Sequence, residues 1–370
     1  MAVESLYQGN KDVFLAKVRA DFDAVEDQAL KATRALQDWS LVGADGNANA
    51  LFTMVTNITD DGDRAVWRHI GVAGLQQLGT RKAGGIYPEA TFIRAYETAV
   101  YDPDQQVSAR FIVPEEREAK EGHKYKTVLN RAQKILYEMD RQNIADIFEI
   151  FNLAFTVPTS YPTRFFAKGT QGTDGNYTAL NEYLISIQHA RADGGTTISN
   201  AVQVSGNSAV FSDTNYYAAK EQGATFVDDV GKAMPMFGGK CSLIVPPSNG
   251  LVRLATEIDK SEWKTLTTNN DINVMQSMLT TIKSSPYLLK SFYVSGVANK
   301  NAWFLIDDVV RDPEVGTGLV KIAFVPLQTR VEHEDSVDAT VYKAKETYVY
   351  GWTDWRNIIG SQGLGTAYSN

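Results

Sequence analysis

The longest regular pattern of apolar and polar positions lies between Lys124 and Phe155. Apolar side chains recur there at intervals of three and four residues, which predicts an amphipathic helix. The stripe turns slightly after Asp140, so it allows either one helix or two shorter helices with a kink. One helix over 124–155 would be about 48 Å long at 1.5 Å per residue. Pro158 and Pro162 would end it, because proline cannot continue a helix.

Two strand patterns precede this helix, at 91–100 and 106–113. The residues Asp102-Pro103-Asp104 between them predict a turn, since proline supplies the fixed φ that a turn needs. The two strands are therefore expected to pair as a hairpin. A hairpin of this length is marginally stable alone, so it needs a surface to lie on, in its own domain or in another molecule.

The rest of the chain predicts a mixture of short helices and strands without internal repeats. A turn is expected at 60–63, and Ser212 or Asp213 is a suitable N-cap for a helix that follows. The predicted helices are 10–39, 213–234, 251–258 and 271–284, and the predicted strands are 240–245, 302–306, 320–325, 339–345 and 346–352.

The C-terminal region holds four large aromatic residues within eight positions, Tyr348, Tyr350, Trp352 and Trp355. Aromatic side chains at this density fill a core or an interface, because each buries a large apolar surface. Residues so close to a terminus are usually polar and frayed. The last strands are therefore expected to close a domain that begins much earlier in the chain.

Composition excludes several classes of protein. The 370 residues are 44% hydrophobic and 22% charged, as in ordinary globular proteins, and no apolar run approaches the length of a membrane-spanning helix. The net charge is −8 without a basic stripe, which argues against tight binding of DNA or RNA. The single cysteine, Cys241, excludes an intramolecular disulfide and favours folding in a reducing compartment, and the N-terminus lacks the pattern of a secretory signal.

Motifs for catalysis or cofactor binding are not evident. Gly238-Gly239-Lys240 is not a phosphate loop, since Met234 stands where that motif needs glycine and Cys241 where it needs Ser or Thr. The histidines are dispersed and the pairs Asp228-Asp229 and Asp307-Asp308 lack calcium-loop spacing, so solvated loop charge is expected for both pairs. We expect no enzyme, no cofactor and no metal site.

The order of these elements resembles the major capsid protein of tailed bacteriophages, which has the Hong Kong 97-type fold. The resemblance also rests on the aromatic tail from Tyr348 to Gly363 and on the strand, Pro246-Pro247 and helix that run from Leu243 to Ile258. It implies an α+β fold with an N-terminal arm, an extended β-hairpin loop, a long spine helix in a peripheral domain and an inserted α/β axial domain. The implied ranges are 1–50 for the arm, 51–83 for the first part of the peripheral domain, 84–114 for the extended loop, 115–169 for the part with the spine helix, 170–325 for the axial domain and 326–370 for the closing strands and tail.

The resemblance implies a shell of pentamers and hexamers that encloses double-stranded DNA without sequence-specific binding. It implies a separate scaffold, a portal and cement proteins as partners, assembly in the host cytoplasm, and no membrane. The chain has no lysine between Lys82 and Lys120, so the extended loop cannot form the lysine–asparagine cross-link of the type member. The residues implied at the subunit interface are Phe92, Arg94, Tyr96, Tyr101, Asp102, Arg110, Phe111, Trp352, Trp355 and Arg356.

Three other interpretations remain open from the sequence. An encapsulin-like nanocompartment would use the same fold to enclose a protein cargo. A soluble α/β enzyme would carry a site without a recognisable motif. A tail or decoration protein of a phage would not form closed shells alone.

Overall fold

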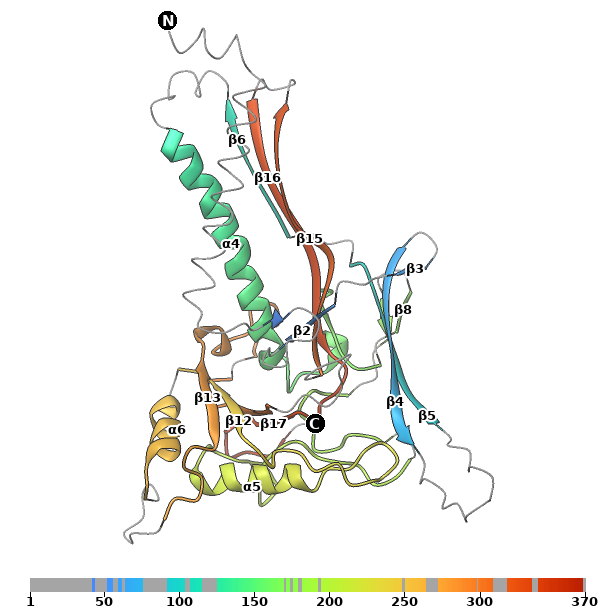
Figure 1. The fold of residues 1–370 in the computed structure, drawn as a ribbon, viewed down its shortest axis with the longest axis vertical. Coiled ribbons are helices and arrows are strands. Elements are labelled where there is room, and N and C mark those ends of the chain that lie inside the picture. The colour runs from blue at the N-terminus through green and yellow to red at the C-terminus, as the bar shows by residue number, and fades with distance from the viewer. Residues whose placement is uncertain are drawn as a thin grey trace, which may run out of the picture. The chain divides into compact units, whose positions relative to one another are not determined.

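The computed structural model of the chain describes residues 42–43, 52–55, 59–61, 64–75, 92–103, 107–114, 125–169, 171–173, 176–178, 182–191, 194–247, 250–263, 272–297, 299–308, 318–334 and 339–368. These residues form a mixed α+β fold of three α-helices and four sheets (Figure 1). The predicted helix at 10–39 lies outside them. Among the described residues, a smaller compact unit comprises 102–146 and 323–348, and a larger unit comprises the remainder.

The predicted long helix is confirmed as one continuous element, α4 (Tyr125–Asn152). Its apolar stripe is buried at Leu136 and Met139 in the smaller unit and from Ile147 onward in the larger unit. The helix ends at Asn152, before the predicted end at 155, and the residues after it form turns, in which the N–H groups of Ala154 and Thr156 donate to the carbonyls three positions earlier. A short 3-10 turn follows at Pro158–Ser160. In the smaller unit the Tyr348 hydroxyl donates a 2.7 Å hydrogen bond to the buried carboxylate of Asp146 and so ties α4 to β16.

A six-stranded sheet contains the closing strands of the chain. Its order is β1 (Val42–Gly43), β2 (Phe52–Val55), β15 (Leu319–Glu334), β16 (Ala339–Trp352) and β6 (Val107–Pro114), and β7 (Phe165–Phe166) also pairs with β16. The two strands predicted at 339–345 and 346–352 are thus one strand. The pairing of β15 with β2, at Val320↔Thr53, confirms that the end of the chain closes a sheet begun much earlier.

The second sheet contains the hairpin of β4 and β5. Its order is β3 (Thr59–Asp61), β4 (Arg64–Leu75), β5 (Phe92–Tyr101), β8 (Gln171–Thr173) and β9 (Asn176–Thr178). The predicted turn at 60–63 is confirmed by the antiparallel pairing of Asp61 with Arg64. The strands predicted at 91–100 and 106–113 are present as β5 and β6, but the prediction that they pair with each other is wrong.

The physical reason is that each of these strands has a better partner elsewhere. β5 pairs with β4 from Tyr101↔Val66 to Phe92↔Leu75, whereas β6 pairs with β16 from Val107↔Glu346 to Pro114↔Ala339. The link at Asp102 and Pro103 therefore connects two sheets and does not close a hairpin. Neighbouring strands in sequence pair often but not always.

The middle of the larger unit is a four-stranded sheet with two helices. Its order is β13 (Leu279–Ser284), β12 (Cys241–Val245), β14 (Trp303–Asp307) and β17 (Ile358–Ser361), and the helices are α5 (Asp213–Ala224) and α6 (Leu251–Lys260). The predictions of β12, α6 and β14 are confirmed. A small ladder, β10 (Gln203–Val204) with β11 (Asn207–Ser208), lies before α5. β17 pairs with β14, so part of the segment 326–370 completes this middle sheet.

Two helix predictions in this region need correction. Ser212 caps α5 as predicted, since its hydroxyl accepts from the Asn215 N–H, but the helix ends at Ala224 and not at residue 234. The Asp228 carboxylate accepts the N–H groups of Val230 and Lys232 and stabilises a turn there instead. The predicted helix at 271–284 is wrong. The described residues 272–278 form an isolated bridge and turns, and 279–284 are β13, because the β-branched residues 280–282 suit a strand paired with β12.

Candidate subunit interface

The hairpin of β4 and β5 is anchored at its base. Val66, Trp67 and the three residues 98–100 are buried, and the Trp67 ring lies 5.8 Å from that of Phe166. The Thr98 hydroxyl accepts a 3.0 Å hydrogen bond from the Gly169 N–H. β3 and β8 add a strand on each side only near this base, at residues 64–66 of β4 and at Ala99 of β5. The base is therefore a packed part of the larger unit.

The outer half of the hairpin differs from its base. Beyond Ile70↔Glu97, the strands pair with each other down to Leu75↔Phe92, and within the described residues no third strand joins them (Figure 1). The register shifts on both sides of Val72↔Arg94, which indicates bulges in this half. A two-stranded ribbon is marginal in water without a surface beneath it. This segment is the strongest candidate for contact with another molecule.

The predicted interface residues fall into three groups. Phe92, Arg94 and Tyr96 lie on the outer half of β5, and Tyr101 and Asp102, both half-exposed, lie at its base. Arg110, which is exposed, and Phe111 lie on β6 in a different sheet.

The third group consists of Trp352, Trp355 and Arg356, whose side chains are all buried within this chain. Of the two alternatives for the aromatic tail, core or interface, these residues belong to the core. The prediction that these three residues lie at the subunit interface is corrected, because a buried side chain presents no surface to a neighbour.

Arg356 and Trp355 belong to a buried polar cluster in the larger unit. The Arg356 guanidinium lies 2.8 Å from the Asp229 carboxylate and 3.0 Å from that of Asp354, and Trp355 stacks on the ring of His189 at 4.0 Å. Asp229 is thus a buried ion-pair partner and not the solvated loop charge that the sequence predicted. Asp307 is likewise buried and accepts the Phe237 N–H at 2.7 Å.

His189 joins a second carboxylate to this cluster. Its Nδ1 lies 2.9 Å from Glu182 Oε1 and its Nε2 lies 2.8 Å from Asn200 Oδ1. Burial lowers the pKa of His189. Burial opposes ionisation of Glu182, but the hydrogen bond with His189 and the charge of Lys168 outweigh it and lower the pKa of Glu182. Each polar group here holds another part of the same core, which favours a structural role.

An exposed apolar patch lies at the end of α6 and was not predicted from the sequence. It comprises Trp263, Ile272, Val274 and Met278, and Ile272 is 72% exposed. The Asn273 side chain donates to the Ile258 and Ser261 carbonyls, which turns Ile272 and Val274 outward. Exposed apolar patches of this kind mark protein contacts. Residues of such a patch look like core residues in the sequence, so only the fold distinguishes them.

Candidate metal ligands are not gathered in the described part of the chain. Within it, no group of three or more His, Cys, Asp or Glu side chains could hold a metal ion. Burial raises the pKa of the Cys241 thiol to about 12, so this cysteine is an inert core residue at neutral pH. No helix among the described residues is long and apolar enough to span a membrane.

Comparison with known proteins gives structural likenesses only. No family model matches the chain, and no curated protein sequence matches it. The chain is similar to the capsid of the cyanophage P-SCSP1u, with 14% identity over 84% of this chain and 85% of that chain and a TM-score of 0.43. It is also similar to a structure from Mycobacterium phage Patience, with 9% identity over 95% and 89% and a TM-score of 0.49.

A third similar structure is a virus-like particle from Pyrococcus furiosus, with 9% identity over 94% of this chain and 99% of that chain and a TM-score of 0.38. All three TM-scores are below 0.5.

Proposed function

We propose that this chain is the major capsid protein of a tailed bacteriophage, of the Hong Kong 97 type, which assembles into the icosahedral shell around the double-stranded DNA genome. The observation that carries the proposal is the hairpin of β4 and β5. Its base is packed in the larger unit, and its outer half has no third strand within the described residues. A neighbouring copy would supply the missing surface, and repeated copies would close a shell by symmetry.

In this proposal the hairpin of β4 and β5 is the extended loop and α4 is the spine helix. Phe92, Arg94 and Tyr96 contact the neighbour from the outer half of the hairpin, and Tyr101, Asp102, Arg110 and Phe111 contribute from its base and from β6. The apolar patch at the end of α6 forms a second contact in the axial domain. Individual contacts can be weak, since many copies accumulate them.

The charge balance fits a container for DNA. The net charge of −8 disfavours adhesion of packed DNA to the shell wall. The protein would be found in the virion, after assembly in the host cytoplasm with a separate scaffold, a portal and cement proteins.

Electron microscopy of the purified protein, produced alone and together with a scaffold, tests the proposal. We expect closed icosahedral particles of uniform diameter. A monodisperse monomer by light scattering at high concentration, under all of these conditions, would contradict it.

The contents of the particles test the nanocompartment alternative. Nucleic acid inside particles from infected cells supports a capsid, whereas a single protein cargo supports an encapsulin-like shell. The segment 76–91 that joins β4 to β5 contains Lys82, so the sequence argument against a lysine cross-link does not hold for this hairpin. A denaturing gel of mature particles tests whether copies of the chain are cross-linked.

A further inference from the structure

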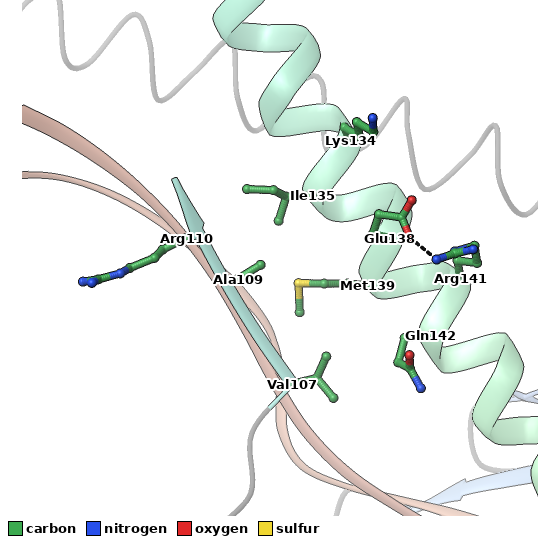
Figure 2. Close-up of a pocket in the computed structure, with 9 residues that line it drawn as sticks. All are labelled: Val107, Ala109, Arg110, Lys134, Ile135, Glu138, Met139, Arg141 and Gln142. Carbon is green, nitrogen blue, oxygen red and sulfur yellow. Dashed lines mark ion pairs between the residues drawn. The ribbon is translucent and has the colours of Figure 1, made fainter. Parts of the chain in front are cut away.

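A groove in the smaller unit runs between α4 and β6 (Figure 2). Its volume is about 580 Å³, within the range of about 300–1,000 Å³ that is typical of binding pockets. Val107 and Ala109 of β6 and Ile135 and Met139 of α4 point toward one another across it, whereas Arg110 points to the other side of the strand. The floor of the groove is therefore apolar.

The rim of the groove on the helix side is charged. Lys134 and Arg141 are exposed there, and Glu138 forms a 2.6 Å ion pair with Arg141. Two cations and one carboxylate leave this rim with a positive balance. An apolar floor with a positive rim suits an amphipathic segment that carries acidic residues beside its apolar stripe.

We propose that the groove is the docking site of residues 10–39 of the same chain, bound as an amphipathic helix. The sequence predicts a helix there, with Phe14, Val18, Phe22 and Val25 on one stripe. Residues 10–39 hold six acidic and five basic side chains, and five of the acidic ones lie within 12–27, so the N-terminal part of the segment carries the negative balance that complements the rim. An isolated helix is marginal in water, so this stripe needs a partner surface.

The lengths of the two partners agree. A helix of 30 residues is about 45 Å long and α4, with 28 residues, is about 42 Å long. Other long segments outside the described residues fit less well. Residues 76–91 contain three glycines and a proline, and residues 115–124 contain one apolar side chain, Ala119.

The short connection to β1 favours docking of residues 10–39 in the groove of their own chain over docking in another copy. Residue 39 lies three positions before β1, which is a strand of the same sheet as β6. A tether this short gives an effective concentration in the millimolar range, so docking within one chain outcompetes docking between chains. The inference does not depend on the shell function.

Disulfide trapping tests the proposal in the full-length protein. The pair Ala109→Cys and Val18→Cys places one thiol beside the groove and one on the apolar stripe. The matched control replaces Val18→Cys with Ala20→Cys, which lies on the opposite side of the predicted helix. Cys241 stays in place, because its buried thiol, with a pKa of about 12, does not compete at neutral pH.

We expect a disulfide within single chains, seen as a monomer of altered mobility on a non-reducing gel, at least tenfold faster for the Val18→Cys pair than for the control. Equal rates, no disulfide, or products of dimer mass alone would overturn the proposal.

Limited proteolysis provides a second readout if the double variant does not fold. In the full chain, Ile135→Asn should expose the segment and increase trypsin cleavage after Lys17 and Arg19 at least tenfold. Tyr137→Asn is the control, since Tyr137 is exposed on α4 and does not line the groove. Cleavage rates that do not differ between the two variants would overturn the proposal.

Discussion

Two β-rich regions of the larger unit differ in the strands with which they pair. The C-terminal stretch buries Tyr350, Trp352 and Trp355 completely or nearly so, and its strands pair with β7 and β14. The hairpin of β4 and β5 is buried at its base, and its outer half pairs with no third strand within the described residues. The number of partners that a strand finds within its own chain, and not its composition, separates a core element from one that reaches outward.

The largest change in the free energy of unfolding is expected from a substitution in the buried C-terminal stretch. Trp355 packs on His189 at 4.0 Å, on Phe226 at 5.4 Å and under the Arg356 guanidinium at 4.8 Å. We expect Trp355→Ala to lower the free energy of unfolding by about 3–5 kcal/mol, because it opens a cavity and uncovers buried charges. Urea denaturation measures this, and a loss below about 1 kcal/mol would contradict the assignment to the core.

A smaller effect is expected at the polar side of the same core. Glu182→Gln removes the charge that faces His189 and Lys168 and should cost about 1–3 kcal/mol at neutral pH. Glu257→Gln, at an exposed ion pair with Arg253, is the matched control and should change stability little.

The pKa shifts of Glu182 and His189 determine the direction in which the stability of the fold changes with pH. The pKa of Glu182 lies below its ordinary value of 4.5, so its contribution is present above pH 4.5 and is lost as the pH falls through the folded-state value. The pKa of His189 lies below 6.5, so the contribution of its neutral form is likewise lost as the pH falls. Below pH 4.5, acid should therefore destabilise the wild type more steeply than Glu182→Gln, as measured by unfolding at a series of pH values. Equal slopes would rule out this role of Glu182.

The smallest effect on folding is expected at the exposed patch. Trp263 is 50% exposed, so Trp263→Ala should change the free energy of unfolding by about 0.5 kcal/mol or less. If the patch is a contact between copies, the same variant should slow particle formation, which light scattering follows. Unchanged assembly would show that the patch lies outside the interface.

Patterns that depend on local sequence were predicted well. The stripe of α4, the apolar runs of β12 and β14 and the N-cap of α5 depend on residues a few positions apart. The burial of the aromatic tail was also predictable, since several large side chains in a row cannot all remain in water.

Features that depend on long-range partners were not predictable. Nothing near β5 indicates that its partner is β4 and not β6, because strand composition does not encode register between distant segments. The strand β13 was taken for a helix, and the burial of Asp229 depends on Arg356, which lies 127 positions away. For the candidate interface, the sequence placed residues on β5 and β6 but missed the apolar patch and misassigned the tail.

Shortening the hairpin tests the central claim most directly. Ile70 and Glu97 are directly opposite, so residues 71–96 can be replaced by Asn-Gly, which closes a two-residue hairpin turn on the retained base. We predict that the free energy of unfolding changes by less than about 1 kcal/mol, because the removed half has no third strand in the described part of the chain, while electron microscopy finds no closed particles. Normal particles from the shortened chain, or its failure to fold, would contradict the account.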